Sequence, residues 1–389
     1  MRVLLAFDKF KDSLTAREAG ELARQALRDR HGDWSFDVCP LADGGEGFGE
    51  ILTAAAGGTA RQFTVEGPRG RRAASSVGFV PLEHIPAGAR ELLGLGGGRP
   101  SSSPPDQVAL IEMASASGLA LLAPEERDPW HTTTFGTGQL IRHAADGGAS
   151  LILLGVGGSA THDLGLGALA ALGLGFSTGD SRDVHPPVPE QWRHITRLTG
   201  RVPAALPPIR IACDVTNPLL GSRGAAAVYG PQMGLRAADF ARLEHASARM
   251  AMLLCHHCNQ PDALMDTPGA GAAGGISFGL MAAAGAQLLP GFELVSAWLD
   301  LERRLAAADL IITGEGRFDD SSLSGKGPGA VAARALALGK RVHVFAGAVS
   351  TGAEHPGLTL HAITPPDMPL ERALREAADN LRQAVHRAF

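Results

Sequence analysis

The sequence predicts an α/β protein of two domains. The chain of 389 residues is longer than one ordinary hydrophobic core requires. Short apolar runs alternate with segments of helical periodicity, as expected for strands followed by helices. The chain holds 50 glycines, which gather after the apolar runs rather than in linker-like tracts. Both ends of the chain have the strand–helix order of a parallel sheet, whereas the middle begins with an antiparallel signal.

The two ends of the chain are expected to form one discontinuous domain, residues 1–60 plus 290–389. Residues 3–7 predict a buried strand because the run is short and apolar, and a helix follows with Ser13 as its predicted N-cap. A second strand at 36–41 completes a strand–helix–strand opening with a right-handed crossover. The carboxyl end adds strands at 309–313, 341–346 and 358–363 and a last helix at 370–388. We therefore expect a parallel, doubly wound sheet of the Rossmann or flavodoxin type.

Residues 61–289 are expected to form an inserted α/β domain with a mixed sheet. A hairpin is predicted at 61–80 around the glycine- and proline-containing turn at 67–70. Further strands are predicted at 108–111, 151–154 and 210–213, and helices up to 145, at 165–172, at 237–258 and up to 286. Polar, proline-rich segments at 82–106 and 177–208 predict irregular structure. A cleft between the two domains is the expected place for a substrate.

The composition argues against several classes of function. The net charge of −5, the lack of a long basic block and an aromatic content of 5% argue against a nucleic-acid partner. No apolar stretch approaches the length of a membrane span, and the first residues lack a signal-peptide pattern. We expect a cytoplasmic protein with no membrane partner. Residues 255–258 (Cys-His-His-Cys) are interpreted as a helix end rather than a metal site, since no second pair follows at zinc-finger spacing.

Three loops that combine glycines with acids follow apolar runs and carry the candidate chemistry. They lie at residues 42–47, 155–163 and 313–320. Exposed backbone N–H groups suit phosphate oxygens, and carboxylates suit magnesium or proton transfer. Lys9 and Lys11 follow the first strand, and Lys326 follows the last of these loops. A phosphate cradle, metal ligands and a mobile cation together indicate phosphoryl transfer.

The two glycine loops also have plain structural interpretations. Residues 155–160 resemble a dinucleotide fingerprint, but no acid at the end of a following strand completes the unit. Phosphate binding and a tight turn therefore both stay open there. Lys326 lies in Ser-Gly-Lys-Gly, which is not a P-loop because Asp320 stands where the first glycine is required. A surface turn is the alternative interpretation for Lys326.

Two other polar segments follow predicted strands. Residues 8–13 lie at the carboxyl end of the first strand, where open parallel sheets bind ligands, although a solvated loop is the alternative. Asp214 and Asn217 follow the strand at 210–213, and they suit magnesium or hydroxyl binding. A simple Asx turn before Pro218 explains the same residues equally well.

Six motifs in order resemble the class I glycerate kinases, the bacterial-type family that phosphorylates D-glycerate with ATP. They cover nearly the whole chain, at residues 8–16, 40–47, 157–163, 213–219, 269–275 and 313–326. The resemblance implies two α/β domains, ATP with Mg²⁺, and D-glycerate as the small-molecule substrate, with 2-phosphoglycerate as the usual product. The chain departs from the family pattern at Lys9, His162, Leu164, Met233 and Ser321. These departures lie in loops of the predicted site, so they bear on which hydroxy acid accepts the phosphoryl group.

The hypothesis that follows is in-line transfer of the ATP γ-phosphoryl group to a glycerate hydroxyl. The catalytic candidates are the bases Asp214, as first choice, and Asp319, together with the charge-neutralising Lys11 and Lys326. The substrate-binding candidates are Asp8, Lys9, Ser13, Arg69, Asn217 and Arg317. The ATP-binding candidates are Gly157, Gly158, Ser159, Thr161, Asp163, Gly271 and Gly274. The metal-binding candidates are Asp43, Glu46 and Glu315.

Two other functions stay open at this point. A nicotinamide-dependent oxidoreductase acting on a short hydroxy acid would use the same loop at 155–160, although the incomplete Rossmann unit counts against it. A non-catalytic sugar-acid binding protein is the second alternative, and the acids retained in the loops argue against it. The sequence does not give the oligomeric state, and a homodimer is one arrangement it allows.

Overall fold

A computed structural model describes residues 1–95, 106–320, 322, 327–350, 352 and 355–389. Contacts between residues divide the chain into two compact units, which are described separately. Unit 1 comprises Met1–Asp43 and Val295–Phe389, and unit 2 comprises Gly44–Leu294. Residues 44–60, which the sequence analysis assigned to the first domain, thus group with unit 2. The α/β fold class is confirmed, because one sheet is parallel and the other is mixed.

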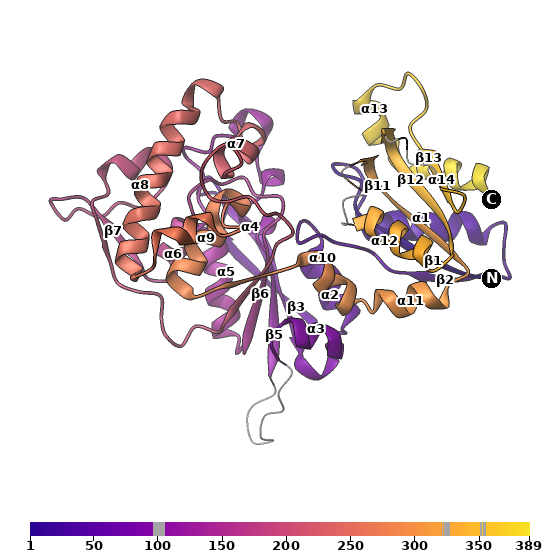
Figure 1. Ribbon diagram of the computed structural model, residues 1–389, viewed down its shortest axis with the longest axis horizontal. Coiled ribbons are helices and arrows are strands. Elements are labelled where there is room, and N and C mark those ends of the chain that lie inside the picture. Colours follow the sequence, from indigo (N-terminus) through magenta and orange to yellow (C-terminus); the bar gives the residue numbers. More distant parts are fainter. Residues whose placement is uncertain (96–105, 321, 323–326, 351, 353–354) are drawn as a thin grey trace. The chain divides into compact units, whose positions relative to one another are not determined.

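Unit 1 is built on a five-stranded parallel sheet of order β13-β12-β11-β1-β2. Its strands are β1 (Arg2–Phe7), β2 (Ser35–Val38), β11 (Leu310–Asp319), β12 (Arg341–Ser350) and β13 (Leu358–Ala362). Its helices are α1 (Ala16–Arg28), α11 (Leu301–Ala307), α12 (Gly327–Ala337), α13 (Leu370–Arg375) and α14 (Ala377–Ala388). Figure 1 shows α1 and α12 on opposite faces of this sheet, which is the doubly wound arrangement.

The core of unit 1 follows from the apolar strands. Val3, Leu5 and Phe7 of β1 are fully buried, and they pack in one cluster with the apolar faces of α1 and α14. Alternate residues of a strand face opposite sides of the sheet, so a strand covered on both faces must be apolar throughout. The predicted last helix is interrupted at Glu376, which lies between α13 and α14.

The N-cap of α1 differs from the prediction. Ser13 is not the cap; instead, its Oγ donates to the Phe10 carbonyl oxygen (3.0 Å) in the preceding turn. Thr15 caps the helix, since its Oγ1 accepts from the Glu18 N–H (3.2 Å) and the Glu18 carboxylate accepts from the Thr15 N–H (2.8 Å). This reciprocal capping box satisfies two N–H groups, which favours Thr15 over Ser13.

Unit 2 is built on a mixed sheet of order β10-β9-β6-β5-β4-β3, in which β3, β4 and β5 run antiparallel and the rest parallel. Its strands are β3 (Thr59–Glu66), β4 (Arg72–Pro81), β5 (Gln107–Glu112), β6 (Leu151–Gly155), β9 (Ile209–Ala212) and β10 (Gln287–Leu289). A separate pair joins β7 (Gly175–Ser177) to β8 (Arg197–Thr199), within the segment predicted to be irregular. The predicted hairpin at 61–80 is confirmed as β3 and β4.

Helices cover both faces of the unit 2 sheet (Figure 1). They are α2 (Phe48–Ala55), α3 (Ala87–Leu92), α4 (Ala114–Ser117), α5 (Phe135–Asp146), α6 (Leu166–Ala171), α7 (Ala225–Tyr229), α8 (Phe240–Cys258) and α9 (Ala272–Ala284), while α10 (Gly291–Trp298) runs on into unit 1. Short 3₁₀ helices lie at Leu82–His84, Leu119–Leu121, Pro124–Glu126, Pro189–His194, Pro231–Met233, Ala237–Asp239 and Asp262–Asp266. In the part of the chain that the structure describes, no helix has the length and apolar character needed to cross a membrane.

Candidate functional site

The first group of candidate residues lies in unit 1, at the carboxyl end of β1 and in the neighbouring part of β11. The two strands pair in parallel with Phe7 opposite Gly314, and the Asp8 N–H donates to the Gly314 carbonyl oxygen (2.9 Å). Asp8 therefore follows β1, and Glu315 lies beside it within β11, directly after the partner of Phe7. The predicted loop at 313–320 is wrong, because β11 continues to Asp319 and pairs with β12 along that length. Gly314 is required there because a Cβ would lie 2.0 Å from the Phe345 carbonyl oxygen. The strand packing thus brings two acids of the predicted site together.

Burial and mutual repulsion perturb these two acids. The pKa of Asp8 is raised to about 6, mainly by burial and next by the charge of Asp43, while Lys9 lowers it. The pKa of Glu315 is raised to about 7, again mainly by burial, while a hydrogen bond from Ser322 lowers it and the charges of Asp8, Asp319 and Asp43 raise it further. Both carboxyl groups thus lie in a site that disfavours their negative charge.

Glu315 has an orphaned atom. Its Oε1 is buried and has no hydrogen-bond partner among the described residues. A buried carboxylate oxygen without a donor costs free energy, because the water it loses on folding is not replaced. The unit 1 site therefore offers an acceptor that a bound cation or donor would satisfy.

The basic residues of unit 1 lie around the same loops. Lys9 Nζ is 3.5 Å from Asp43 Oδ1, and Lys11 is exposed in the turn after β1. Arg317 pairs with Asp319 (3.3 Å) at the end of β11. The backbone of this turn lies beside β11, since a Cβ on Gly316 would be 3.3 Å from the Lys11 nitrogen. The predicted Lys326, like the divergent position Ser321, lies outside the described residues.

The predicted metal ligands are divided between the two units. Asp43 and Glu315 belong to unit 1, whereas Glu46 belongs to unit 2, where its Oε1 lies 3.6 Å from the position of a Cβ on Gly158. Across the described residues there is no group of three or more histidine, cysteine or acidic side chains placed to hold a metal ion. Any metal site of unit 1 therefore needs ligands in addition to these carboxylates.

The second group of candidate residues is the glycine loop after β6 in unit 2. The Gly157 N–H donates to the Gly44 carbonyl oxygen (2.9 Å), so it is not free for a phosphate. A Cβ on Gly157 would lie 2.6 Å from Gly45 Cα, which explains the glycine by close approach of two loops. Gly158 is exposed and has φ +74°, a backbone conformation that favours glycine. Among the glycines predicted to bind ATP phosphates, Gly158 is the exposed one.

Asp163 anchors the protein backbone. Its fully buried carboxylate accepts hydrogen bonds from five donors: the Thr134 N–H and Oγ1, the Thr133 Oγ1, and the N–H groups of Gly165 and Gly167. Burial raises its pKa, while the hydrogen bonds from Thr134, Gly167 and Gly165 lower it. Because α5 begins at Phe135 and α6 at Leu166, one carboxylate serves the first turns of two helices. Asp163 is therefore a structural residue that holds the starts of α5 and α6 in place.

The remaining side chains of this loop are also buried. Ser159 Oγ and Thr161 Oγ1 are 3.0 Å apart and bond to each other. His162 Nε2 lies 3.1 Å from Ser247 Oγ, and burial lowers the pKa of this histidine to about 4. The divergent residue His162 is therefore neutral at physiological pH and faces the interior of unit 2.

The predicted base Asp214 contacts the start of α10. Its Oδ2 accepts from the Phe292 N–H (2.9 Å). A carboxylate at the first turn of a helix satisfies an N–H that has no partner within the helix. Asp214 therefore has a structural partner at a helix start in unit 2, which is not the Asx turn offered as the alternative, and its role as a base stays a prediction.

Asn217 and the glycines at 271 and 274 hold loops together. Asn217 Nδ2 donates to the Arg223 carbonyl oxygen (2.8 Å), and Tyr229 donates its O–H to Asn217 Oδ1 (2.7 Å). The Gly271 N–H donates to the Asn217 carbonyl oxygen (3.0 Å), and a Cβ on Gly274 would lie 1.9 Å from the Thr161 carbonyl oxygen. These positions are explained by packing between loops.

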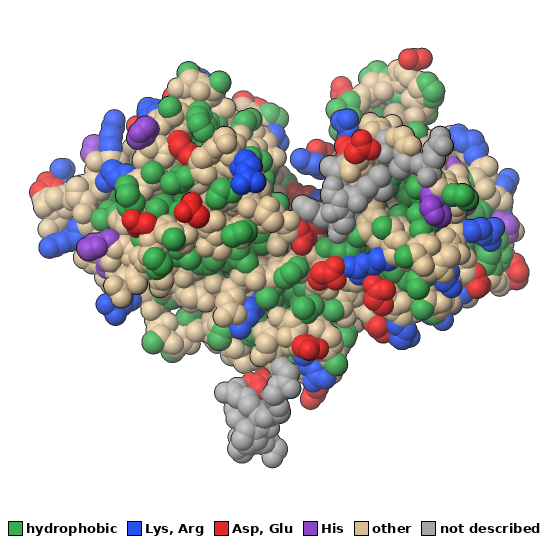
Figure 2. All heavy atoms as spheres, in the orientation of Figure 1, with side chains coloured by type: hydrophobic (Ala, Val, Ile, Leu, Met, Phe, Trp, Pro, Cys, Tyr) green, Lys and Arg blue, Asp and Glu red, His purple; other side chains and the backbone are tan. Residues whose placement is uncertain are grey.

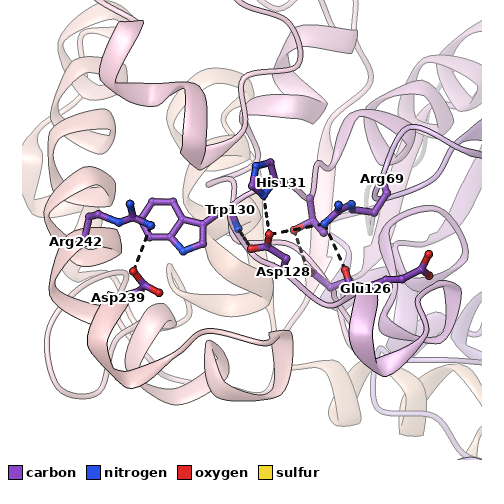
Figure 3. A network of polar contacts seen from close by, with 9 residues as sticks. Arg69, Glu126, Asp128, Trp130, His131, Asp239 and Arg242 are labelled. Atoms are coloured by element: carbon purple, nitrogen blue, oxygen red, sulfur yellow. Dashed lines mark hydrogen bonds and ion pairs between the residues drawn. The ribbon is translucent and has the colours of Figure 1, made fainter.

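Arg69 leads to residues that the sequence analysis missed. It lies in the β3–β4 turn, where its Nη1 donates to the Glu126 carbonyl oxygen (3.4 Å) and lies 3.9 Å from Asp128 Oδ2 (Figure 3). The same Asp128 oxygen is 2.7 Å from Nδ1 of His131. The sequence signal was a histidine three residues after an aspartate, directly before three threonines, and it matches no catalytic motif by itself.

The charged side chains on the face shown in Figure 2 are scattered. Lysines and arginines alternate there with acids and hydrophobic side chains. Such a mixture is what a net charge of −5 spread over a globular surface produces.

Comparisons with known proteins identify the family. A model described as "Glycerate kinase family" matches residues 3–389. The chain belongs to the glycerate kinase family. The predicted resemblance is thereby confirmed, and with it the assignment to the kinase enzymes.

Individual relatives match over nearly their whole length. The glycerate 2-kinase of Escherichia coli K12 is 35% identical over 99% of this chain and 96% of its own length. The glycerate kinase of Halalkalibacterium halodurans is 35% identical over 98% of this chain and 96% of its own length. The crystal structure of a candidate glycerate kinase 2 from Salmonella typhimurium LT2 matches with a TM-score of 0.75 and 36% identity, covering 100% of this chain and 97% of that one.

Proposed function

We propose that the protein transfers the γ-phosphoryl group of ATP to the 2-hydroxyl of D-glycerate and releases ADP and 2-phosphoglycerate. Family membership supports glycerate phosphorylation, and the name of the Escherichia coli relative, glycerate 2-kinase, supports the 2-hydroxyl. The observation that carries the proposal is the pair Asp8, directly after β1, and Glu315, beside it in β11, with raised pKa values and one buried oxygen without a partner among the described residues. These features suit a bound cation, and membership of a kinase family implies a nucleotide substrate.

The residues of unit 1 fit a magnesium ion carried by a nucleotide. Mg²⁺ is commonly bound through one or two carboxylates together with substrate phosphates and water. One or two of the carboxylates of Asp8, Asp43 and Glu315 would hold it, since their charges already act on one another. When bound, Mg²⁺ neutralises the negative charge of the phosphate oxygens. In such a site, phosphate oxygens and water supply the metal ligands that the protein does not.

The basic residues of unit 1 act on the phosphates and the substrate carboxylate. Lys9 is held at Asp43 and keeps a positive charge beside the acids. Lys11 is exposed on the turn after β1, so it can follow a phosphate during transfer. Arg317, fixed by Asp319, supplies a second cation for an anionic substrate. In unit 2, Gly158 stays a proposed phosphate-binding position, because it is exposed in the glycine loop after β6.

An ADP-release assay with D-glycerate, ATP and Mg²⁺ tests the proposal. We expect turnover that depends on D-glycerate, and phosphorus NMR should identify 2-phosphoglycerate. L-Glycerate and an acceptor-free reaction are the controls. Folded protein with no glycerate-dependent ADP release contradicts the proposed activity, whereas 3-phosphoglycerate as product contradicts only the position of transfer. A change in nicotinamide absorbance with glycerate instead supports the oxidoreductase alternative.

A further inference from the structure

A cavity lies at the amino end of the unit 1 sheet, where β1 and β2 begin beside α11 (Figure 1). Its volume of about 510 Å³ is in the range of cavities that hold small molecules. We call it the arginine pocket, and its lining residues, all in unit 1, are Arg2, Ser35, Phe36, Asp37, Arg303 and Arg304. Asp8 follows the opposite end of β1, about 20 Å away by the rise of a strand. The arginine pocket is therefore separate from the site of Asp8 and Glu315.

The lining of the arginine pocket carries an excess of positive charge. Three guanidinium groups, which stay charged at physiological pH, share the lining with the single carboxylate of Asp37. Asp300 offsets part of the excess, because it pairs with Arg303 from outside the lining. The whole chain, by contrast, carries a net charge of −5. A concave surface whose charge is opposite to that of the whole protein attracts anions.

The protein holds two of the three arginines in place. Arg304 donates from Nε to the Leu299 carbonyl oxygen (2.7 Å) and from Nη1 to Asp37 Oδ1. Arg2 Nη2 lies 3.7 Å from Asp37 Oδ2, so one carboxylate pairs with both guanidinium groups. Side chains that are already ordered lose less conformational freedom when a ligand binds. These contacts therefore pre-organise the arginine pocket for an anion.

The arginine pocket retains donors that the fold does not use. Arg303 is 70% exposed, and beyond Asp300 no described residue accepts a hydrogen bond from it. Among the described residues, Ser35 Oγ has no hydrogen-bond partner, although the Ser35 N–H donates to the Met1 carbonyl oxygen (3.0 Å). A guanidinium presents its N–H groups as a planar fork that fits two oxygens of a phosphate or carboxylate. An anion can therefore bind without breaking the ion pairs that hold the arginines.

The donors of the arginine pocket suit a phosphate group better than a second carboxylate. They come from β2 and from two positions of α11, in addition to Arg2 at the start of β1. A phosphate monoester has three terminal oxygens and a charge of about −2 at neutral pH, whereas a carboxylate has two oxygens and a single charge. Phe36 is half-buried in the lining and offers an apolar wall to the rest of the ligand.

We propose that the arginine pocket binds the phosphate group of a small phosphorylated metabolite, with Arg303, Arg304 and Ser35 as donors. The bound phosphate joins α11 to the starts of β1 and β2. This site takes no part in the transfer of the γ-phosphoryl group. The proposal goes beyond the proposed kinase function and does not depend on it, because binding is measurable without turnover.

Isothermal titration calorimetry with phenyl phosphate and with inorganic phosphate tests the proposal on the whole chain. We expect phenyl phosphate to bind more tightly, because its ring can pack against Phe36. R303Q should weaken the binding of both about 10-fold, because charge-assisted hydrogen bonds are lost. R375Q is the matched control, since Arg375 of α13 is similarly exposed and also pairs with an acid, Glu371. This control should bind as wild type does.

Two further variants locate the bound phosphate. S35A removes one donor and no charge, so we expect a weakening of about 3-fold. D8N alters the other site of unit 1 and should bind phenyl phosphate as wild type does. Unchanged binding in R303Q, or loss of binding in D8N, overturns the proposal, because the ligand then lies elsewhere.

The choice of probes tests the chemical class of the ligand. Wild-type protein that binds neither phosphate probe overturns the proposal. Equal affinity for the two probes overturns the metabolite in favour of free phosphate, and equally tight binding of benzoate overturns the choice of phosphate over carboxylate. All these outcomes leave the proposed function standing. A failed ADP-release assay with phenyl phosphate bound as expected overturns the proposed function and leaves this site standing.

Discussion

Asp163 of unit 2 and Glu315 of unit 1 are both acids in glycine-rich segments, the first in the loop after β6 and the second within β11, but their surroundings are opposite. Asp163 accepts hydrogen bonds from five donors at the starts of two helices. Glu315 has a buried oxygen with no partner among the described residues, and neighbouring acids raise its pKa further. Similar sequences of glycine and acid thus occur in both segments, but the number of donors around the carboxylate decides whether it supports the fold or is left to bind a ligand.

The two carboxylates should therefore contribute to stability with opposite signs. A buried carboxylate whose oxygens are satisfied replaces its lost hydration with protein hydrogen bonds. One without enough donors retains the cost of its desolvation until a cation or proton reaches it. Conservative amide substitutions at the two positions test this difference directly.

The largest effect is expected from Asp163→Asn. The amide nitrogen of asparagine cannot accept, so it would face N–H groups that now donate to Asp163. We expect the free energy of unfolding to fall by about 3 kcal/mol, measured by urea denaturation. Asp146→Asn, at an exposed position of the same unit, is the control and should change it little. A loss below about 1 kcal/mol at Asp163 would remove the contrast between the two carboxylates.

Glu315→Gln should have the opposite effect, and the effect should depend on pH. Because the pKa is raised from 4.5 to about 7, the folded protein holds a proton that the unfolded chain releases. The stability from that proton is present below pH 4.5 and is lost as the pH rises through 7. At pH 8 the wild type bears the full cost of the charge, whereas glutamine bears none.

We expect Glu315→Gln to raise the free energy of unfolding at pH 8 by about 1–2 kcal/mol, a value reduced for partial exposure of the carboxyl group. The gain should be smaller at pH 5. Urea denaturation at the two pH values measures it, with the largely exposed Glu371→Gln of α13 as the control. Equal stability of wild type and variant at pH 8 would show that Glu315 is as well accommodated as Asp163.

The sequence predicts the strands and the strand-end loops better than it predicts what the loops do. Apolar runs identify strands because a strand covered on both faces has no polar positions, as in β1 and β6. A loop glycine is ambiguous, since a phosphate and a neighbouring backbone both require the missing side chain. Gly157 is explained by its approach to Gly45, which is distant in the sequence. That contact is fixed only when the two loops meet in the fold.

Several site residues were out of reach of sequence reasoning for the same reason. Asp43 and Glu46 are three residues apart, yet they belong to different units of the structure. The contact between His131 and Asp128 likewise depends on the fold, because Arg69 and the Trp130 N–H hold the Asp128 carboxylate in place. The sequence shows which residues are present. Whether their hydrogen bonds are satisfied depends on the tertiary structure.

The smallest effect on stability is expected from Asp214→Asn, and this variant tests whether Asp214 is the base. Asp214 was the first candidate from the sequence, but its Oδ2 accepts from the Phe292 N–H at the start of α10. Asparagine also accepts at helix starts, so we expect unfolding free energy to fall by less than about 1 kcal/mol. If the Asp214 carboxylate only holds the start of α10, kcat should stay within about 3-fold of wild type in the ADP-release assay. A 100-fold loss of kcat without loss of stability would make Asp214 the base. It would also show that a carboxylate with a backbone hydrogen bond can still take part in the reaction. The contrast between Asp163 and Glu315 predicts instead that the carboxylates without enough donors are the ones that bind ligands.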